Sequence, residues 1–161
     1  MQTLYGWEVD QDIPLTKLER HLHTQINKSV ALYLTNLVYL IEVCQYSMVD
    51  KAKRLAKFIQ TDEDAKASTT IAANSIITFL RNDDQLNSFI KKEGIESYIN
   101  EEVLKKIFAE LSSKQRYKDY SALKKPNQEQ DKEIIGYILK KVFPAVKDFE
   151  HHLDWPNYRQ N

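Results

Sequence analysis

The sequence predicts an all-α protein, a helical bundle around one long, apolar central helix over about residues 27–59. Three Gly and four Pro among 161 residues leave little material for the tight turns of β-sheets. Residues that favour helices, such as Leu, Lys, Glu, Gln and Ala, are plentiful. In residues 30–49, apolar side chains nearly encircle a helical wheel, as is typical of a helix surrounded by others.

The N-terminal third predicts three helical segments. Residues 1–9 resemble the back half of an amphipathic helix, without a capping residue before it, so we expect its front half to be missing. Pro14 suits the first turn of a second helix. The central helix then begins near Asn27 or Ser29 and runs to about Ile59. The apolar face of the second helix comprises Leu15, Leu18, Leu22 and Ile26, and the expected core of the central helix comprises Leu34, Leu37, Leu40 and Ile41.

The remaining chain predicts shorter helices joined by polar connectors. Residues 61–68 are expected to be a connector, followed by a helix over 71–81. Asp83 or Asp84 caps a helix over 85–92 that ends at Gly94. The next helix opens at Asn100, and its core face is Val103, Leu104, Ile107, Phe108 and Leu111. The last opens at residues 126–127, is kinked or restarted by Pro144, and points Ile134, Ile135, Ile138, Leu139 and Val142 inward.

Length and composition predict a single domain, 1–161, without a membrane span. Residues 30–49 are long enough to cross a bilayer, but Asn36, Glu42 and Gln45 would each need a polar partner in lipid. The single Cys44 excludes an intramolecular disulfide and fits a reducing compartment. No cationic and apolar signal sequence follows Met1. We therefore expect a cytoplasmic protein.

The opening motif, Gln2-Thr3-Leu4-Tyr5-Gly6-Trp7, is followed by an acidic turn, a short helix and a long apolar one. This pattern resembles the first half of the transcription antitermination factor NusB family. The resemblance implies an all-helical protein that binds a short single-stranded RNA in nascent ribosomal transcripts together with ribosomal protein S10. It also places Gln2 and Tyr5 near the RNA-facing first helix, although Tyr5 and Trp7 could instead be core anchors.

The resemblance covers only part of the family's pattern. Its arginine-rich stretch would precede Met1, and its C-terminal half, which ends in a motif like Phe-Val-Asn-Gly, is not found in this sequence. Residues 1–59 match the NusB-like helices, whereas residues 60–161 are more similar to the expanded N-terminal half of some members. We therefore expect this chain to be part of a longer protein.

A second candidate RNA surface depends on composition alone. Residues 105–125 hold seven Lys or Arg side chains against two carboxylates, with tyrosines among the cations. Cations that track phosphates and rings that stack on bases are typical of single-strand binding. Its proposed contacts are Lys114, Arg116, Tyr117 and Lys118. The alternative is an ordinary solvated helix end and connector.

The residues give little support for an enzyme, a metal site or a cofactor. Cys44 lies in the most apolar stretch, where a thiolate is disfavoured. His21 and His23 are two residues apart and point to different sides of a helix. A di-iron bundle needs two carboxylate-x-x-His motifs, and only Asp148-x-x-His151 is found. Two hypotheses remain: an RNA-binding antitermination module, or a helical protein–protein interaction or scaffold domain without nucleic-acid binding.

Overall fold

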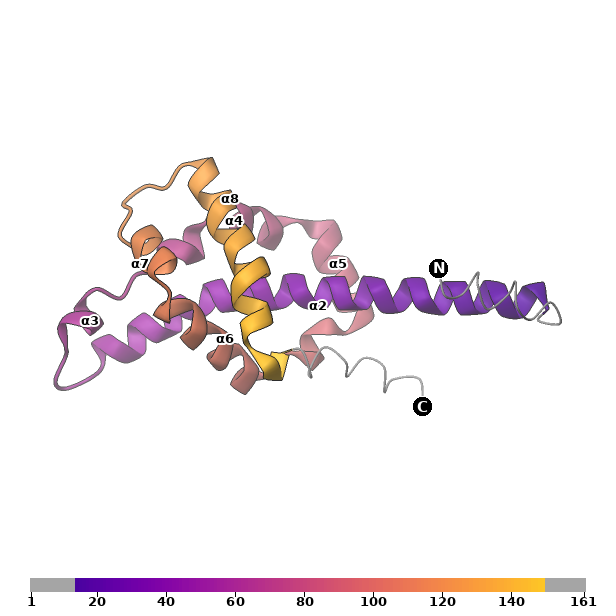
Figure 1. Ribbon diagram of the computed structural model, residues 1–161, viewed down its shortest axis with the longest axis horizontal. Coiled ribbons are helices and arrows are strands. Elements are labelled where there is room, and N and C mark those ends of the chain that lie inside the picture. The colour runs from indigo at the N-terminus through magenta and orange to yellow at the C-terminus, as the bar shows by residue number, and fades with distance from the viewer. Residues whose placement is uncertain (1–13, 150–161) are drawn as a thin grey trace.

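The computed structural model describes residues 14–149, and every regular element within them is a helix (Figure 1). The all-α prediction is therefore confirmed. The largest element is α2 (Leu15–Leu55), a helix of 41 residues. At 1.5 Å per residue it is about 60 Å long. Figure 1 shows the other helices gathered around its C-terminal part, while its N-terminal part extends beyond them.

The predicted break in α2 near Asn27 and Ser29 is wrong, because the helix is continuous there. The Ser29 hydroxyl donates to the Gln25 carbonyl oxygen at 3.1 Å. A serine side chain that could cap a helix start therefore lies inside the helix. It bonds back to a carbonyl oxygen one turn earlier, as serine commonly does in helices. The C-terminal boundary also needs correcting, since α2 ends at Leu55 rather than near Ile59.

Burial along α2 divides the helix into two parts. The buried residues all lie between positions 34 and 47: Leu34, Thr35, Val38, Tyr39, Leu40, Ile41, Val43, Cys44 and Ser47. Of the four expected core residues, Leu34, Leu40 and Ile41 are buried and Leu37 is only half-buried. The expected apolar face at residues 15–26 is not packed into the core, since Leu15 is 74% exposed and Ile26 57%.

Five short elements follow α2: α3 (Asp62–Ala65), η1 (Thr70–Ala73), α4 (Ser75–Asn82), α5 (Asp84–Glu93) and η2 (Ile95–Tyr98). The helix predicted over 85–92 is confirmed as α5 and is one residue longer at each end. The Asp83 carboxylate accepts from the Leu86 amide at 3.0 Å, and Gly94 ends the helix at φ 63° in the left-handed region that favours glycine. The expected connector at 61–68 instead contains α3, which Thr61 and Asp64 start with a reciprocal capping box.

The C-terminal elements are α6 (Glu101–Ser113), α7 (Gln115–Ser121), α8 (Gln128–Tyr137), the π-helical η3 (Ile138–Val142) and η4 (Phe143–Ala145). Asn100 and Asn127 cap α6 and α8 as predicted, and the expected core face of α6 is wholly buried. In the last predicted helix, Leu139 was expected to point inward but is exposed. A π-helical turn is wider than an α-helical one, so the predicted spacing does not hold there. Pro144 lies in η4, where the helix type changes.

The main core joins the middle of α2 to α6, α8 and η3. Tyr39 is central to it. Its ring packs edge-to-face on Phe149 with centroids 4.9 Å apart, and its hydroxyl accepts from the Asn100 amide at 2.9 Å. A smaller cluster joins Leu34 and Val38 to Ile90, Ile95 and Tyr98. Long-range contacts therefore hold only the C-terminal two thirds of α2.

A buried polar network fixes the position of α7 against its neighbours. The Tyr120 hydroxyl donates to Asp131 Oδ1 at 2.7 Å and accepts from Asn74 Nδ2 at 3.1 Å. The Ser75 amide donates to Asp131 Oδ2 at 3.0 Å. Burial alone would raise the pKa of Asp131, but the hydrogen bonds from Ser75 and Tyr120 outweigh it and lower this pKa. The network links the start of α4, the end of α7 and α8.

Candidate nucleic-acid interface

The basic stretch 105–125 spans the end of α6, the whole of α7 and part of the connection to α8. Its first two lysines are held by carboxylates. Lys105 Nζ lies 3.4 Å from Glu101 and 3.3 Å from Glu102, and Lys106 forms an ion pair with Asp148. These contacts raise the pKa of both lysines, the hydrogen bonds to Glu102 and to Asp148 being the largest causes. We therefore assign them to helix surface rather than to an anion site.

Two of the four predicted contact residues are also engaged. Lys114 precedes the first turn of α7 and forms an ion pair with Glu110 at 2.7 Å. The Arg116 guanidinium lies over the Tyr137 ring, 5.3 Å from its centroid. This cation–π contact leaves the guanidinium exposed and orients it. Arg116 thus remains available to a phosphate, whereas Lys114 must first leave Glu110.

Three other cations in the stretch form no salt bridge among the described residues. Lys118, Lys124 and Lys125 are exposed, and none forms a salt bridge with another residue in the range 14–149. Lys118 comes from α7, and the other two from the connection that follows. Within residues 105–125, the cations without a salt bridge therefore lie on α7 and its C-terminal connection.

The interleaved tyrosines do not face solvent, which corrects the picture of Tyr117 as an exposed stacking platform. Tyr117 is 7% exposed and Tyr120 5%. The Tyr117 ring packs edge-to-face on Phe108 at a centroid distance of 6.1 Å, and burial raises its pKa to about 12. The two tyrosines lie three residues apart, so they share the face of α7 that points into the core. The cations occupy the other faces.

A cleft of about 660 Å³ lies beside Lys118, between α7, the end of α6 and the α2–α3 region. Its volume is within the range of small-molecule sites. Its walls carry the cations Arg54, Lys66 and Lys118, the acids Asp50 and Glu63, and the hydroxyls of several serines. The side-chain oxygen of Ser121 is buried on this wall, beside the Tyr117 hydroxyl. The cleft extends the polar surface around α7 towards α3.

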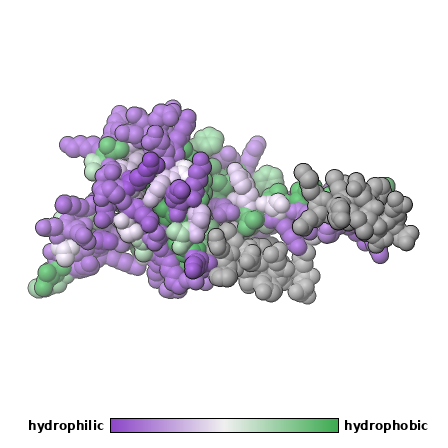
Figure 2. Space-filling view, in the orientation of Figure 1, coloured by the Kyte–Doolittle hydropathy of each residue, from purple (hydrophilic) through white to green (hydrophobic). Residues whose placement is uncertain are grey.

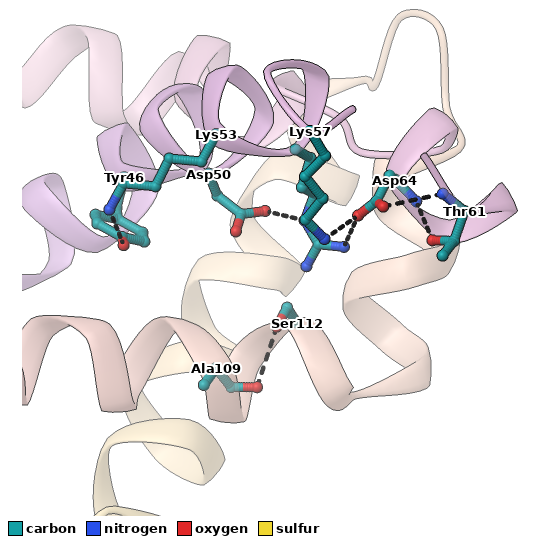
Figure 3. Close-up of polar contacts among 9 residues, drawn as sticks. Tyr46, Asp50, Lys53, Lys57, Thr61, Asp64, Ala109 and Ser112 are labelled. Carbon is teal, nitrogen blue, oxygen red and sulfur yellow. Dashed lines mark hydrogen bonds and ion pairs between the residues drawn. The ribbon is translucent and has the colours of Figure 1, made fainter. Parts of the chain in front are cut away.

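Ion pairs around Asp64 hold the α2–α3 wall of this cleft (Figure 3). Asp64 Oδ1 accepts from Lys57 Nζ at 3.0 Å and from Arg54 at 3.3 Å. Its Oδ2 accepts from the Thr61 amide at 3.0 Å. The Thr61 amide is the largest cause, followed by Lys57, of a pKa lowered to about 2. Arg54 also donates to Asp50 at 2.7 Å, so the turn after α2 is closed by a connected charge network.

Sequence reasoning missed Arg54 and Lys66 as part of this surface. Both lie far from residues 105–125 in the chain, and composition gave no reason to join the two regions. One signal was available: Thr61-x-x-Asp64 has the spacing of a capping box and predicts a helix start where we expected a connector. The two candidate residues from the NusB resemblance, Gln2 and Tyr5, lie outside the described residues.

Other chemistry considered from the sequence finds no assembled site between positions 14 and 149. Cys44 is fully buried, and burial raises the pKa of its thiol. No group of three or more His, Cys, Asp or Glu side chains in this range is arranged to hold a metal. His21 and His23 are both exposed on α2. No helix within these limits combines the length and apolar character needed to cross a bilayer.

Comparisons with protein-family models, with curated proteins and with solved structures give no match to this chain.

Proposed function

We propose that this protein is an RNA-binding module of a transcription antitermination factor. It acts on nascent ribosomal transcripts together with ribosomal protein S10. The observation that carries the RNA-binding proposal is the group of exposed cations around α7, Arg116, Lys118, Lys124 and Lys125, which have no salt bridge to the rest of the described chain. The resemblance of the opening motif to the NusB family supports the assignment to antitermination and the S10 partner.

The chemistry of the α7 surface fits phosphate contacts better than base recognition. Its cations can track a backbone, whereas Tyr117 and Tyr120 are committed to the core and leave the surface without stacking rings. Base contacts would then come from elsewhere, and the resemblance points to Gln2 and Tyr5. We therefore expect affinity from α7 and sequence preference from the N-terminal segment.

The test is a salt titration of binding to a fluorescent single-stranded RNA, read as anisotropy. In the double variant Lys124→Gln and Lys125→Gln, up to two phosphate contacts are lost. The slope of log affinity against log salt should then flatten by about 0.7 for each lost contact. Lys91→Gln with Lys92→Gln is the matched control, because it removes an adjacent exposed lysine pair from α5. Equal effects of the two double variants would contradict a site at α7.

Tyr5→Ala tests the surface that the resemblance implies. Loss of one stacking platform costs about 1–3 kcal/mol of binding and leaves the salt slope unchanged. Thermal unfolding of the variant comes first, since Tyr5 could also be a core residue. Unaltered binding by a well-folded variant would remove Tyr5 from the site and leave α7 as the sole candidate surface.

A second candidate function, a protein–protein interaction module, is favoured by one observation. Phe58 and Ile59 are almost wholly exposed in the turn between α2 and α3. Figure 2 shows a hydrophobic tip at this end of the molecule. Exposed apolar groups of this kind mark partner sites. In this alternative the protein binds no RNA, and replacing both residues by Ser should weaken its binding to a purified protein partner without lowering its thermal stability.

A further inference from the structure

The N-terminal part of α2 carries an apolar stripe that the described part of the chain leaves open. The stripe consists of Leu15, Leu22, Ile26 and Tyr33. These positions recur at spacings of four and seven residues, which return to one side of an α-helix. Leu15, Ile26 and Tyr33 are more than half exposed, and Leu22 more than a third. Large apolar side chains on a helix that extends past its neighbours (Figure 1) form a surface for a partner.

The stripe is continuous with an interface that already exists. The same spacings lead from Tyr33 to Leu37, which is half-buried, and on to Leu40 and Cys44 in the main core. The side of α2 that carries the stripe is therefore also a side that packs on the body of the molecule. A second helix laid on the stripe would continue this packing towards Leu15.

The charges on this part of α2 allow two copies of the stripe to meet. Among the Asp, Glu, Lys and Arg side chains of residues 15–33, only Glu19 lies beside the stripe. The cations lie on the opposite side of the helix, given 3.6 residues per turn. They are Lys17, Arg20 and Lys28. Two copies that pair through the stripe keep these cations on their outer sides, so no repulsion between cations opposes the pairing.

The spacing of the stripe is the same when it is followed from either end. Leu15 and Tyr33 lie nine residues on either side of Thr24, and Leu22 and Ile26 lie two residues on either side. Two antiparallel copies of α2 centred at Thr24 therefore place Leu15 opposite Tyr33, and Leu22 opposite Ile26. A large apolar side chain then meets another at each of these levels. Glu19 lies at the level of the neutral Ser29 and meets no like charge.

We propose that two copies of this chain dimerise by antiparallel pairing of α2 between Leu15 and Tyr33. This stretch is about 27 Å long. The other helices gather around the C-terminal part of α2 (Figure 1), so antiparallel copies have their bodies at opposite ends of the contact. Parallel copies would bring both bodies to the same end. Four large apolar side chains from each copy make a small interface, so the dimer should form only at micromolar or higher protein concentration.

Sedimentation equilibrium of the full chain over a range of concentrations tests the proposal. Leu22→Asp and Ile26→Lys should each weaken dimerisation by at least about tenfold, because each sets an unpaired charge against an apolar side chain. An equimolar mixture of the two variants should dimerise again. In the antiparallel register the two substituted positions face each other and form an ion pair, while the remaining Leu22 faces the remaining Ile26. Asn27→Asp, the matched control, adds a charge away from the stripe and should leave dimerisation unchanged.

Each other outcome overturns the proposal. A chain that stays monomeric up to its solubility limit does not pair through α2. A dimer that Leu22→Asp and Ile26→Lys leave intact, or that Asn27→Asp weakens equally, uses another surface. Variants that dissociate and are not restored by mixing contradict the antiparallel register, since parallel copies would set each position against itself. Circular dichroism of each variant checks the fold, and Leu15→Asp mixed with Tyr33→Lys provides an independent pair.

Discussion

The two ends of α2 are one continuous helix with very different surroundings. From Leu34 to Ser47 it is buried against α6, η1 and η2, and its side chains form the centre of the core. Towards Leu15 the helix extends past the other helices (Figure 1), and the large apolar side chains of Leu15, Ile26 and Tyr33 are more than half exposed. The same spacing of apolar residues runs through both parts, so periodicity alone does not decide burial. What differs is the presence of packing partners, which come from distant parts of the chain.

The largest expected effect separates these two parts directly. Leu40→Ala should lower the free energy of unfolding by about 2–5 kcal/mol, because a fully buried leucine leaves a cavity in a closely packed core. Ile26→Ala on the exposed part should cost less than about 1 kcal/mol. Both are measured by denaturant titration with a common slope. Similar losses of unfolding free energy at the two positions would show that both parts of α2 are packed alike.

The buried polar network gives a second, smaller contrast. Tyr120→Phe leaves Asp131 Oδ1 without its donor in a buried setting and should destabilise by about 1–3 kcal/mol. Tyr33→Phe removes the same hydroxyl from an exposed ring on the uncovered part of α2 and should change stability by less than about 0.5 kcal/mol. Thermal unfolding of both variants provides the measurement. A neutral Tyr120→Phe would show that the network does not hold α7.

The smallest expected effect concerns the end of α2 and appears only in acid. The pKa of Asp64 is lowered to about 2 by the Thr61 amide and Lys57, whereas an unfolded Asp titrates near 4. Its contribution to stability is therefore complete above about pH 4 and is lost as pH falls towards 2. Asp64→Asn should remove this part of the acid dependence. Glu63→Gln, next to it and exposed, is the control, and an unchanged acid profile in Asp64→Asn would refute the assignment.

Much of the fold could be predicted from the sequence because local chemistry determines it. Asp83, Asn100 and Asn127 cap helices with their own side chains, and Gly94 adopts the left-handed conformation that ends one. These signals need no knowledge of the tertiary structure. The break expected near Ser29 failed for the opposite reason. A serine can cap a helix or bond back within one, and only the surrounding chain decides between them.

The sequence predicted which residue types make up the candidate site, but not which of their side chains are available at the surface. The sequence shows that cations are concentrated in residues 105–125, and the spacing of Lys105 and Lys114 four residues after Glu101 and Glu110 was a signal of ion pairs on a helix. The pair between Lys106 and Asp148 joins distant parts of the chain and has no local signal. The spacing of Tyr117 and Tyr120 was a signal that they share the inner face of α7. The approach of Arg54 and Lys66 depends on how α3 folds back, which no local pattern encodes.

Amide hydrogen exchange of the full chain, with and without a single-stranded RNA, tests whether α7 is the RNA site. RNA should slow exchange in residues 115–125, where the cations without a salt bridge lie. Exchange in α5, whose lysines Lys91 and Lys92 lie in its last turn, should not change. If RNA binds and leaves residues 115–125 unchanged, or slows α5 to the same extent, the α7 surface is not the RNA site and the proposed function loses its structural support.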